Sequence, residues 1–454
     1  MSAKAAVQID SGTEQVDSAQ EQESRTTSSS KRVVEARSPS LKDYITSQDI
    51  NLARHAAAVR PFRQGEFGTG PASPSEAHRL ATNQLIEKLR QPLLQSSRRL
   101  KAIGTQALHA PSFATLRSFN ELKERGHRWV EATEKVWNFY FELFNLRQTS
   151  VAGMLLATDR IALDCYQTIY THLGAARSIP SPPPFSYMET GFAPSTFRRG
   201  VILTKLGRQA NPFPLIKLPY HRLVNPWILG AVPHEVSHNI QADLGLWQLL
   251  PREIFRRLRT AGIDPATSRM WARWHKEVYA DLCGLLLSGP AFVTSLMDIV
   301  GNSPARTVSF NPKQVHPIPY LRVHINLELL RRMGFAKKAE ALGRAWDSLY
   351  PRFLARSIPP QIRRTFPLAN RLVVDTMCFR RFPQYGGKCL AEVVCYAPMH
   401  HTMVQETARR LAAGIDPGII NERFFIGAAR WALDHKLAPP GVITRNFYET
   451  LQRR

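Results

Sequence analysis

The chain has 454 residues, 44% of them hydrophobic, so it is long enough to bury a sizeable core and to form more than one compact unit. Its net charge of +24 favours an acidic partner such as nucleic acid or an anionic surface, but the arginines are spread along the chain and form no zinc-finger, RRM or basic-zipper pattern. Five cysteines without a C-x-x-C pair argue against a disulfide framework and favour buried free thiols in a reducing compartment.

Residues 1–75 are predicted to be a disordered, low-complexity arm and linker. Residues 20–30 are rich in Glu, Gln, Ser and Thr without an apolar period, and prolines and glycines over 61–74 mark the linker. One short helix is predicted over 41–59. The chain starts without an apolar signal segment, and its longest uncharged stretch, 282–297, is short for a bilayer and interrupted by Gly and Pro. We therefore expect a cytoplasmic protein without a transmembrane span.

Residues 76–177 are predicted to form a helical bundle. Apolar residues recur at helical spacing in four stretches, which are 76–103, 113–125, 129–146 and 151–173. Pro92 predicts a kink or a break in the first of them. Aromatic residues line the third stretch, and such a stripe is more typical of a core than of a cofactor site.

Two β-like runs follow a proline-rich break at 178–184. They cover 201–206 and 213–218, and prolines bracket the second run. Since proline is tolerated at sheet edges, these runs favour an edge strand, which could bind an extended peptide by strand addition. A proline-rich connector is an equally good interpretation.

An H-E-x-x-H motif comes next, with His234 and His238 at its ends and Glu235 between them. On a helix the two histidines lie one turn apart on one face, where they can hold one Zn²⁺ while Glu235 points to the open position of the metal. Random placement of 14 histidines gives roughly 0.02 such matches, so the motif is suggestive. Pro233 predicts that the helix kinks or restarts at that residue.

A third ligand is needed, because a catalytic zinc site has three protein ligands and one open position. The third histidine of a metzincin is absent, since positions 241 and 244 are Gln and Leu. Glu277, in a predicted helix over 271–287, supplies a carboxylate, and Asp281 lies four residues on along the same face. Asp281 could accept a ring N–H and fix the tautomer of a ligand histidine. His275 points away from Glu277 and is a weaker candidate.

H-E-x-x-H followed by E-x-x-x-D on a second helix resembles the gluzincin zinc peptidases, the thermolysin-like group, over about residues 200–300. The resemblance implies His234, His238 and Glu277 as zinc ligands and Glu235 as the general base. It also implies that Asp281 holds one of the ligand histidines. Residues 178–335 would then form a metallopeptidase-like core.

A helix predicted over 321–333 is preceded by His316 and carries Tyr320 and Arg322 near its start. A His-Pro pair followed by Arg after E-x-x-x-D is similar to the CAAX-protease-like membrane gluzincins and their soluble relatives. His316 is the candidate for a second catalytic side chain, since it, Tyr320 or Arg322 could polarise a carbonyl or brace the site. The alternative is a helix start with incidental polar groups.

Residues 336–454 are predicted to be a C-terminal helical region without identifiable chemistry. His400 and His401 invite a metal interpretation, but they have no acidic or thiol neighbours in the sequence.

The fold class expected is mainly α (α+β), with a helical bundle and a small edge-strand sheet packed on a two-helix zinc core. The preferred hypothesis is a Zn²⁺-dependent metallopeptidase that hydrolyses peptide or protein substrates. The alternative is a basic binding or scaffold protein, for nucleic acid or another anionic partner, with a structural or vestigial zinc site. A zinc hydrolase acting on a non-peptide amide is a third possibility.

Overall fold

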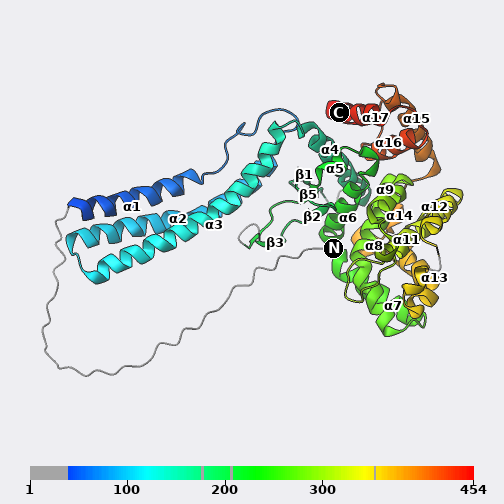
Figure 1. Ribbon diagram of the computed structural model, residues 1–454, viewed down its shortest axis with the longest axis horizontal. Coiled ribbons are helices and arrows are strands. Elements are labelled where there is room, and N and C mark those ends of the chain that lie inside the picture. The colour runs from blue at the N-terminus through cyan, green and yellow to red at the C-terminus, as the bar shows by residue number, and fades with distance from the viewer. Residues whose placement is uncertain (1–38, 175–177, 205–207, 352–353) are drawn as a thin grey trace.

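The computed structural model describes residues 39–174, 178–204, 208–351 and 354–454 (Figure 1). The part of the expected disordered arm at 1–38 lies outside these residues. Residues 39–58 form a helix, as predicted for 41–59, and the expected linker at 61–74 contributes a packed residue, since Phe62 is buried. The helices up to residue 243 are α1 (Pro39–Ala58), α2 (Glu76–His109), α3 (Phe113–Asn145), α4 (Ala152–Leu173), α5 (Tyr220–Leu223) and α6 (Ala231–Asp243). Those that follow are α7 (Leu246–Thr260), α8 (Pro265–Ser288), α9 (Ala291–Val300), α10 (Pro304–Thr307), α11 (Pro319–Arg332) and α12 (Ala336–Leu349). The last are α13 (Pro360–Val374), α14 (Leu390–Val393), α15 (Pro398–Ala412), α16 (Phe424–Asp434) and α17 (Pro440–Arg453).

The strands are β1 (Phe185–Met188), β2 (Ser195–Phe197), β3 (Ile202–Leu203), β4 (Gln209–Ala210) and β5 (Leu215–Leu218). The mainly helical fold with a small sheet is therefore confirmed. None of the helices in the described part of the chain combines the length and the apolar character that a membrane crossing requires.

Helices α1, α2 and α3 lie side by side in an arm that extends away from the rest of the molecule (Figure 1). The helix predicted at 41–59 is α1, and α3 is one continuous helix where two were expected. Gly126 lies in the middle of α3, where a Cβ atom would come within 2.8 Å of Leu52 of α1. The absence of a side chain therefore lets the two helices approach closely.

The base of the arm packs on one face of the sheet through aromatic side chains. Phe62, predicted to lie in a linker, is 1% exposed and contacts Trp137 and Phe144 of α3. Phe144 in turn meets Phe185 of β1, with 5.5 Å between ring centroids. Most of the aromatic stripe of α3 therefore packs in the core, as the sequence predicted, whereas Trp129 is exposed.

The three-stranded sheet has the order β1-β5-β2, with β1 parallel and β2 antiparallel to β5. Leu215 of β5 faces the arm, while Ile216 and Leu218 belong to the main hydrophobic cluster. Two expectations are corrected here. The run at 213–218 contains β5, which is the central strand rather than an edge. In the described part of the run at 201–206, which ends at residue 204, residues 202–203 form β3, which pairs with β4 in a separate ribbon. The edge strand next to α6 is β2, which was not predicted.

A single main cluster of buried apolar side chains runs from Leu155 of α4 to Leu451 of α17 and surrounds α6 and α8. Helix α4 was expected to belong to the N-terminal bundle but packs in this cluster. Helices α8 and α9 are separated at Gly289, as the sequence predicted for this uncharged stretch. The C-terminal helices pack beside α4 and α9, and they are α15, α16 and α17 (Figure 1). Four of the five cysteines are buried and free, and Cys395 is exposed.

Candidate metal centre

Helix α6 holds both histidines in regular helical geometry in spite of Pro233. The helix begins at Ala231, so Pro233 lies in the first turn, where a backbone N–H has no partner within the helix. The predicted restart therefore occurs two residues before the proline. The amide N–H of His234 donates to the carbonyl of Gly230 at 3.3 Å, and the proline carbonyl accepts a hydrogen bond from Ser237 Oγ at 2.6 Å.

Helix α8 presents Glu277 to the two histidines. It is capped by Asp264, whose side chain accepts from the Thr267 N–H, and Pro265 occupies its first position. Most of the helix is buried against α6 and α7, and Gly284 allows Phe292 of α9 to lie against it. These contacts fix the position of α8 along α6, and with it the position of the carboxylate.

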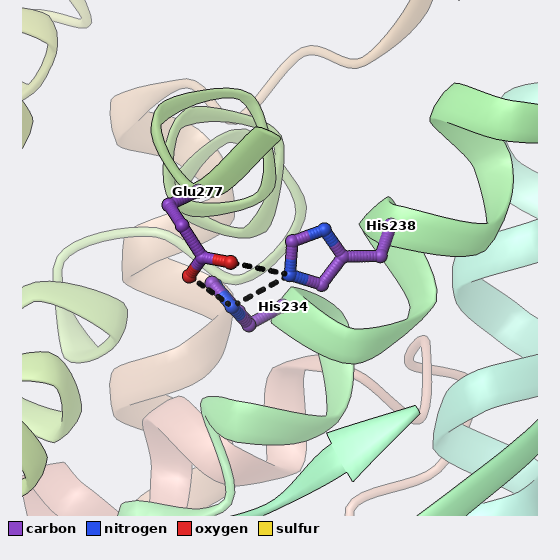
Figure 2. A group of neighbouring side chains, drawn as sticks. All are labelled: His234, His238 and Glu277. Atoms are coloured by element: carbon purple, nitrogen blue, oxygen red, sulfur yellow. Dashed lines mark hydrogen bonds and ion pairs between the residues drawn. The ribbon is translucent and has the colours of Figure 1, made fainter. Parts of the chain in front are cut away.

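His234, His238 and Glu277 converge on one point (Figure 2). The two Nε2 atoms are 3.1 Å apart, and the Glu277 oxygens lie 3.6 Å from His234 Nε2 and 3.5 Å from His238 Nε2. A tetrahedral Zn²⁺ with bonds of about 2.0–2.1 Å separates neighbouring ligand atoms by about 3.3 Å. The three predicted ligands are therefore brought together at the spacing that such an ion requires, and two imidazoles with one carboxylate are a suitable donor set.

Asp281 contacts His234, whereas the sequence predicted only a contact with one of the two histidines. Its Oδ1 lies 2.9 Å from His234 Nδ1, which fixes the proton there and turns Nε2 towards the cluster. Arg322 of α11 donates to both oxygens of Asp281, at 2.6 and 2.8 Å, and lies 3.3 Å from Glu277 Oε2. Arg322 thus links α11 to α8, the helix that carries both carboxylates. His238 Nδ1 has no hydrogen-bond partner among the described residues.

The two histidines differ in protonation. Burial opposes the charged form of His234, but hydrogen bonds to Asp281 and Glu277 outweigh it and raise its pKa to about 10. Burial lowers the pKa of His238 to about 3, and the neighbouring charge of His234 lowers it further. His238 is therefore neutral and ready to ligate, whereas His234 must lose a proton first.

Glu235 is buried but lines the same cavity as the cluster. Burial raises its pKa to about 7, and the charge of Glu277 raises it as well, against the opposing charge of His234. A carboxylate that ionises near neutral pH can both accept and return a proton, which suits a general base. Asn239 donates to the backbone carbonyl of Glu235 and to Thr196 Oγ1 of β2, and so ties this turn of α6 to the edge strand.

The remaining sequence candidates lie in four different settings. His316 is half exposed at the edge of the cavity, with Nε2 3.4 Å from Glu277 Oε2. Tyr320 donates to Asp347 and does not line the cavity. The Nδ1 atom of His275 lies 2.7 Å from the carbonyl oxygen of Ala272, and its ring packs against Trp247, away from the cluster. His400 and His401 lie on α15 and belong to no metal-binding group among the described residues.

A cavity of about 350 Å³ opens over the cluster. Its wall includes β2 at Ser195 and Thr196, and an apolar part comes from α9 with Phe292, Leu296 and Ile299. The cavity wall also includes Arg198, Trp247 and Lys276, which the sequence did not identify as site residues. Of these, only Lys276 carried a signal in the sequence, as the neighbour of Glu277.

Comparisons of the chain with protein-family models, with curated proteins and with solved structures gave no match. The chemical argument therefore rests on the site itself. A buried His/His/Glu cluster able to hold a metal ion lies in a cavity beside a carboxylate whose pKa is near neutral.

Proposed function

We propose that the protein is a zinc-dependent metallopeptidase. The observation that carries this proposal is the convergence of three ligand atoms from α6 and α8 in a cavity that Glu235 also lines. A purely structural zinc site is closed by four protein ligands and has no use for an adjacent base, whereas a catalytic site keeps one position open. The His/His/Glu set with Glu235 beside it fits the second description.

Each side chain has a task in this proposal. Bound Zn²⁺ would polarise a peptide carbonyl and lower the pKa of a water molecule to about 7. Glu235, beside the open position, would serve as the proton acceptor for the attacking water and as the proton donor to the leaving amine nitrogen. Asp281 and Arg322 keep His234 and Glu277 in place. His316, at the edge of the cavity, donates a hydrogen bond to the carbonyl oxygen.

The first experiment measures the metal and the activity on one set of purified proteins. We expect about one zinc per chain in the wild type by elemental analysis, and loss of that zinc in His238→Ala. His109→Ala, at an exposed position on the arm, is the matched control and should keep the metal. Glu235→Gln should also keep the metal but lose about 10²- to 10⁴-fold in peptide hydrolysis. Wild-type protein that binds no zinc would rule the proposal out.

The net charge of +24 favours a second candidate, a basic binding protein with a zinc site that does no chemistry. In that case Glu235→Gln leaves the biological activity unchanged, and binding to DNA or to anionic lipid weakens steeply as salt is added. The same Glu235→Gln protein therefore separates the two candidates.

A further inference from the structure

Two cations in the wall of the metal cavity share one aromatic ring. Arg198 follows β2, Lys276 precedes Glu277 on α8, and Trp247 lies in the first turn of α7. The guanidinium carbon of Arg198 is 3.9 Å from the centroid of the Trp247 ring, and the Lys276 ammonium nitrogen is 4.1 Å from it. The ring of His275 packs edge-on against Trp247, so the indole is held in place.

These two charges are not neutralised by ion pairs. Among the described residues, no carboxylate lies within 4.0 Å of the charged nitrogens of Arg198 or Lys276. Asp243 acts on Arg198 and Glu277 acts on Lys276 only through space. The charge of Asp243 is shared with Arg199, and that of Glu277 with Arg322. Arg322 in the same cavity differs, because Asp281 and Glu277 both pair with it. A cation–π contact contributes about 0.5–2 kcal/mol but leaves the positive charge in place.

Two unpaired like charges against one ring repel each other, so their placement costs free energy unless an anion is present part of the time. A guanidinium fork and an ammonium group together offer several N–H donors, which suit the two oxygens of a carboxylate. The cavity of about 350 Å³ is at the lower end of the range for ligand sites, roughly 300–1,000 Å³, so it admits a short stretch of peptide. Its apolar part on α9 leaves room for a neighbouring uncharged side chain.

We infer that Arg198 and Lys276, held by Trp247, form a carboxylate-binding subsite next to the metal cluster, so that the preferred substrates are peptides with a carboxylate near the scissile bond. The carboxylate belongs either to an acidic side chain or to the C-terminus of the peptide. The statement about preferred substrates rests on the proposed function, because it requires the protein to cleave peptides. The carboxylate-binding subsite itself can be tested without any cleavage.

The activity arm uses zinc-loaded full-length protein and blocked peptides that differ only by Glu or Gln at one position near the scissile bond. A second pair carries Gln throughout and ends in a free carboxylate or in an amide. We expect kcat/KM to favour one of the charged peptides by about tenfold or more, as expected for a hydrogen-bonded charge. Preference within the first pair identifies a side chain, and preference within the second identifies the C-terminus. Equal cleavage of both members in both pairs would overturn the subsite and leave the proposed function standing.

The variants Arg198→Met and Lys276→Met should each lose most of that preference, while Lys276→Arg should retain it because the charge is kept. Lys88→Met, at an exposed position on α2, is the matched control and should behave as the wild type. Zinc content and the far-UV circular dichroism spectrum of every variant show whether it has folded. If a methionine variant does not fold, Lys276→Gln, which removes the charge but keeps a polar side chain, tests the charge requirement against Lys276→Arg.

The binding arm does not depend on turnover. Zinc-loaded Glu235→Gln protein, with and without Lys276→Met, is titrated by calorimetry with three probes. N-acetyl-glutamate α-amide carries only a side-chain carboxylate, N-acetyl-glutamine only a C-terminal carboxylate, and N-acetyl-glutamine α-amide carries neither. Binding of one of the two carboxylates that is about tenfold tighter than binding of the uncharged amide, and that is lost with Lys276→Met, supports the subsite even if no peptide is cleaved and the proposed function fails. Equal binding of all three probes, or carboxylate binding that survives Lys276→Met because the metal alone holds it, overturns the subsite. Inorganic phosphate that binds at Lys276 more tightly than either carboxylate probe would overturn its assignment to a carboxylate.

Discussion

His234 and His238 lie one turn apart on the same helix, yet their surroundings give them opposite proton affinities. His234 has a carboxylate on each ring nitrogen, since Asp281 contacts Nδ1 and Glu277 lies near Nε2. His238 has only the second of these neighbours. The sequence could predict both ligands, because the i, i+4 spacing is local. It could not predict this asymmetry, because the position of Asp281 beside one ring depends on how α8 packs against α6.

Zinc binding should therefore release a proton from His234. Its pKa of about 10 means that the metal-free protein carries this proton at every pH below that value, and Nε2 cannot ligate until the proton leaves. The apparent zinc affinity should rise by up to about tenfold per pH unit and fall as the pH is lowered. Since the pKa of His238 is about 3, His238 adds no further dependence near neutral pH.

The measurement is calorimetry in buffers of different ionisation enthalpy, at about pH 6, on Glu235→Gln protein so that Glu235 does not titrate. We expect about one proton released per zinc. Release of two protons would mean that His238 is charged as well. Release of none would contradict the conclusion that His234 is protonated in the metal-free protein. In Asp281→Asn the pKa of His234 falls, so fewer protons should be released at about pH 7.5 than in the parent.

At the scale of elements, the site is built where α6, α8 and α11 meet, and Arg322 joins the last two. The two helices that carry the ligands could be predicted, because their motifs lie within one or two helical turns. The edge strand β2 could not, since it has only three residues and is defined by pairing with β5. The pairing of Arg322 with Asp281 is equally long-range, and the sequence offered Arg322 only as one of three polar groups.

Arg322→Leu should destabilise the metal-free protein by about 3–5 kcal/mol. The substitution leaves the carboxylate of Asp281, whose side chain is 1% exposed, without its main counter-charge. The double variant Arg322→Leu with Asp281→Leu should lose less than the sum of the single changes, because no buried charge is then left over. Urea unfolding measures the free energy of unfolding of each variant.

The control is Arg344→Leu, which removes an exposed pair with Glu340 and should lower the free energy of unfolding by at most about 1 kcal/mol. Strictly additive losses at Arg322 and Asp281 would contradict this account.

At the scale of the whole molecule, the C-terminal region contacts the helices that position the candidate metal site, although none of the three candidate ligands comes from it. Arg423, just before α16, pairs with Asp164 of α4 through both carboxylate oxygens, at 2.9 and 3.0 Å. It also donates to the carbonyl of Leu287 near the end of α8. This link could not be predicted from the sequence, because its partners are far apart along the chain and charged residues are abundant throughout.

We therefore expect the C-terminal helices and the metal site to unfold together. Arg423→Met leaves Asp164, whose side chain is 5% exposed, without its counter-charge in the main core, and should cost about 3–5 kcal/mol. Zinc release and loss of helical circular dichroism should shift to lower urea by the same amount, since one hydrophobic cluster spans both regions.

The matched control is Arg430→Met on α16, which removes the pairs with Asp298 and Asp434 that lie nearer the surface. Because water already screens those charges, the change should cost at most about 1 kcal/mol and leave the zinc transition almost unmoved. If Arg423→Met instead lowered the circular dichroism transition while zinc stayed bound to the same urea concentration, the C-terminal region would be an independent unit. The support that α8 receives from Arg423 through Leu287 would then have no bearing on the position of Glu277.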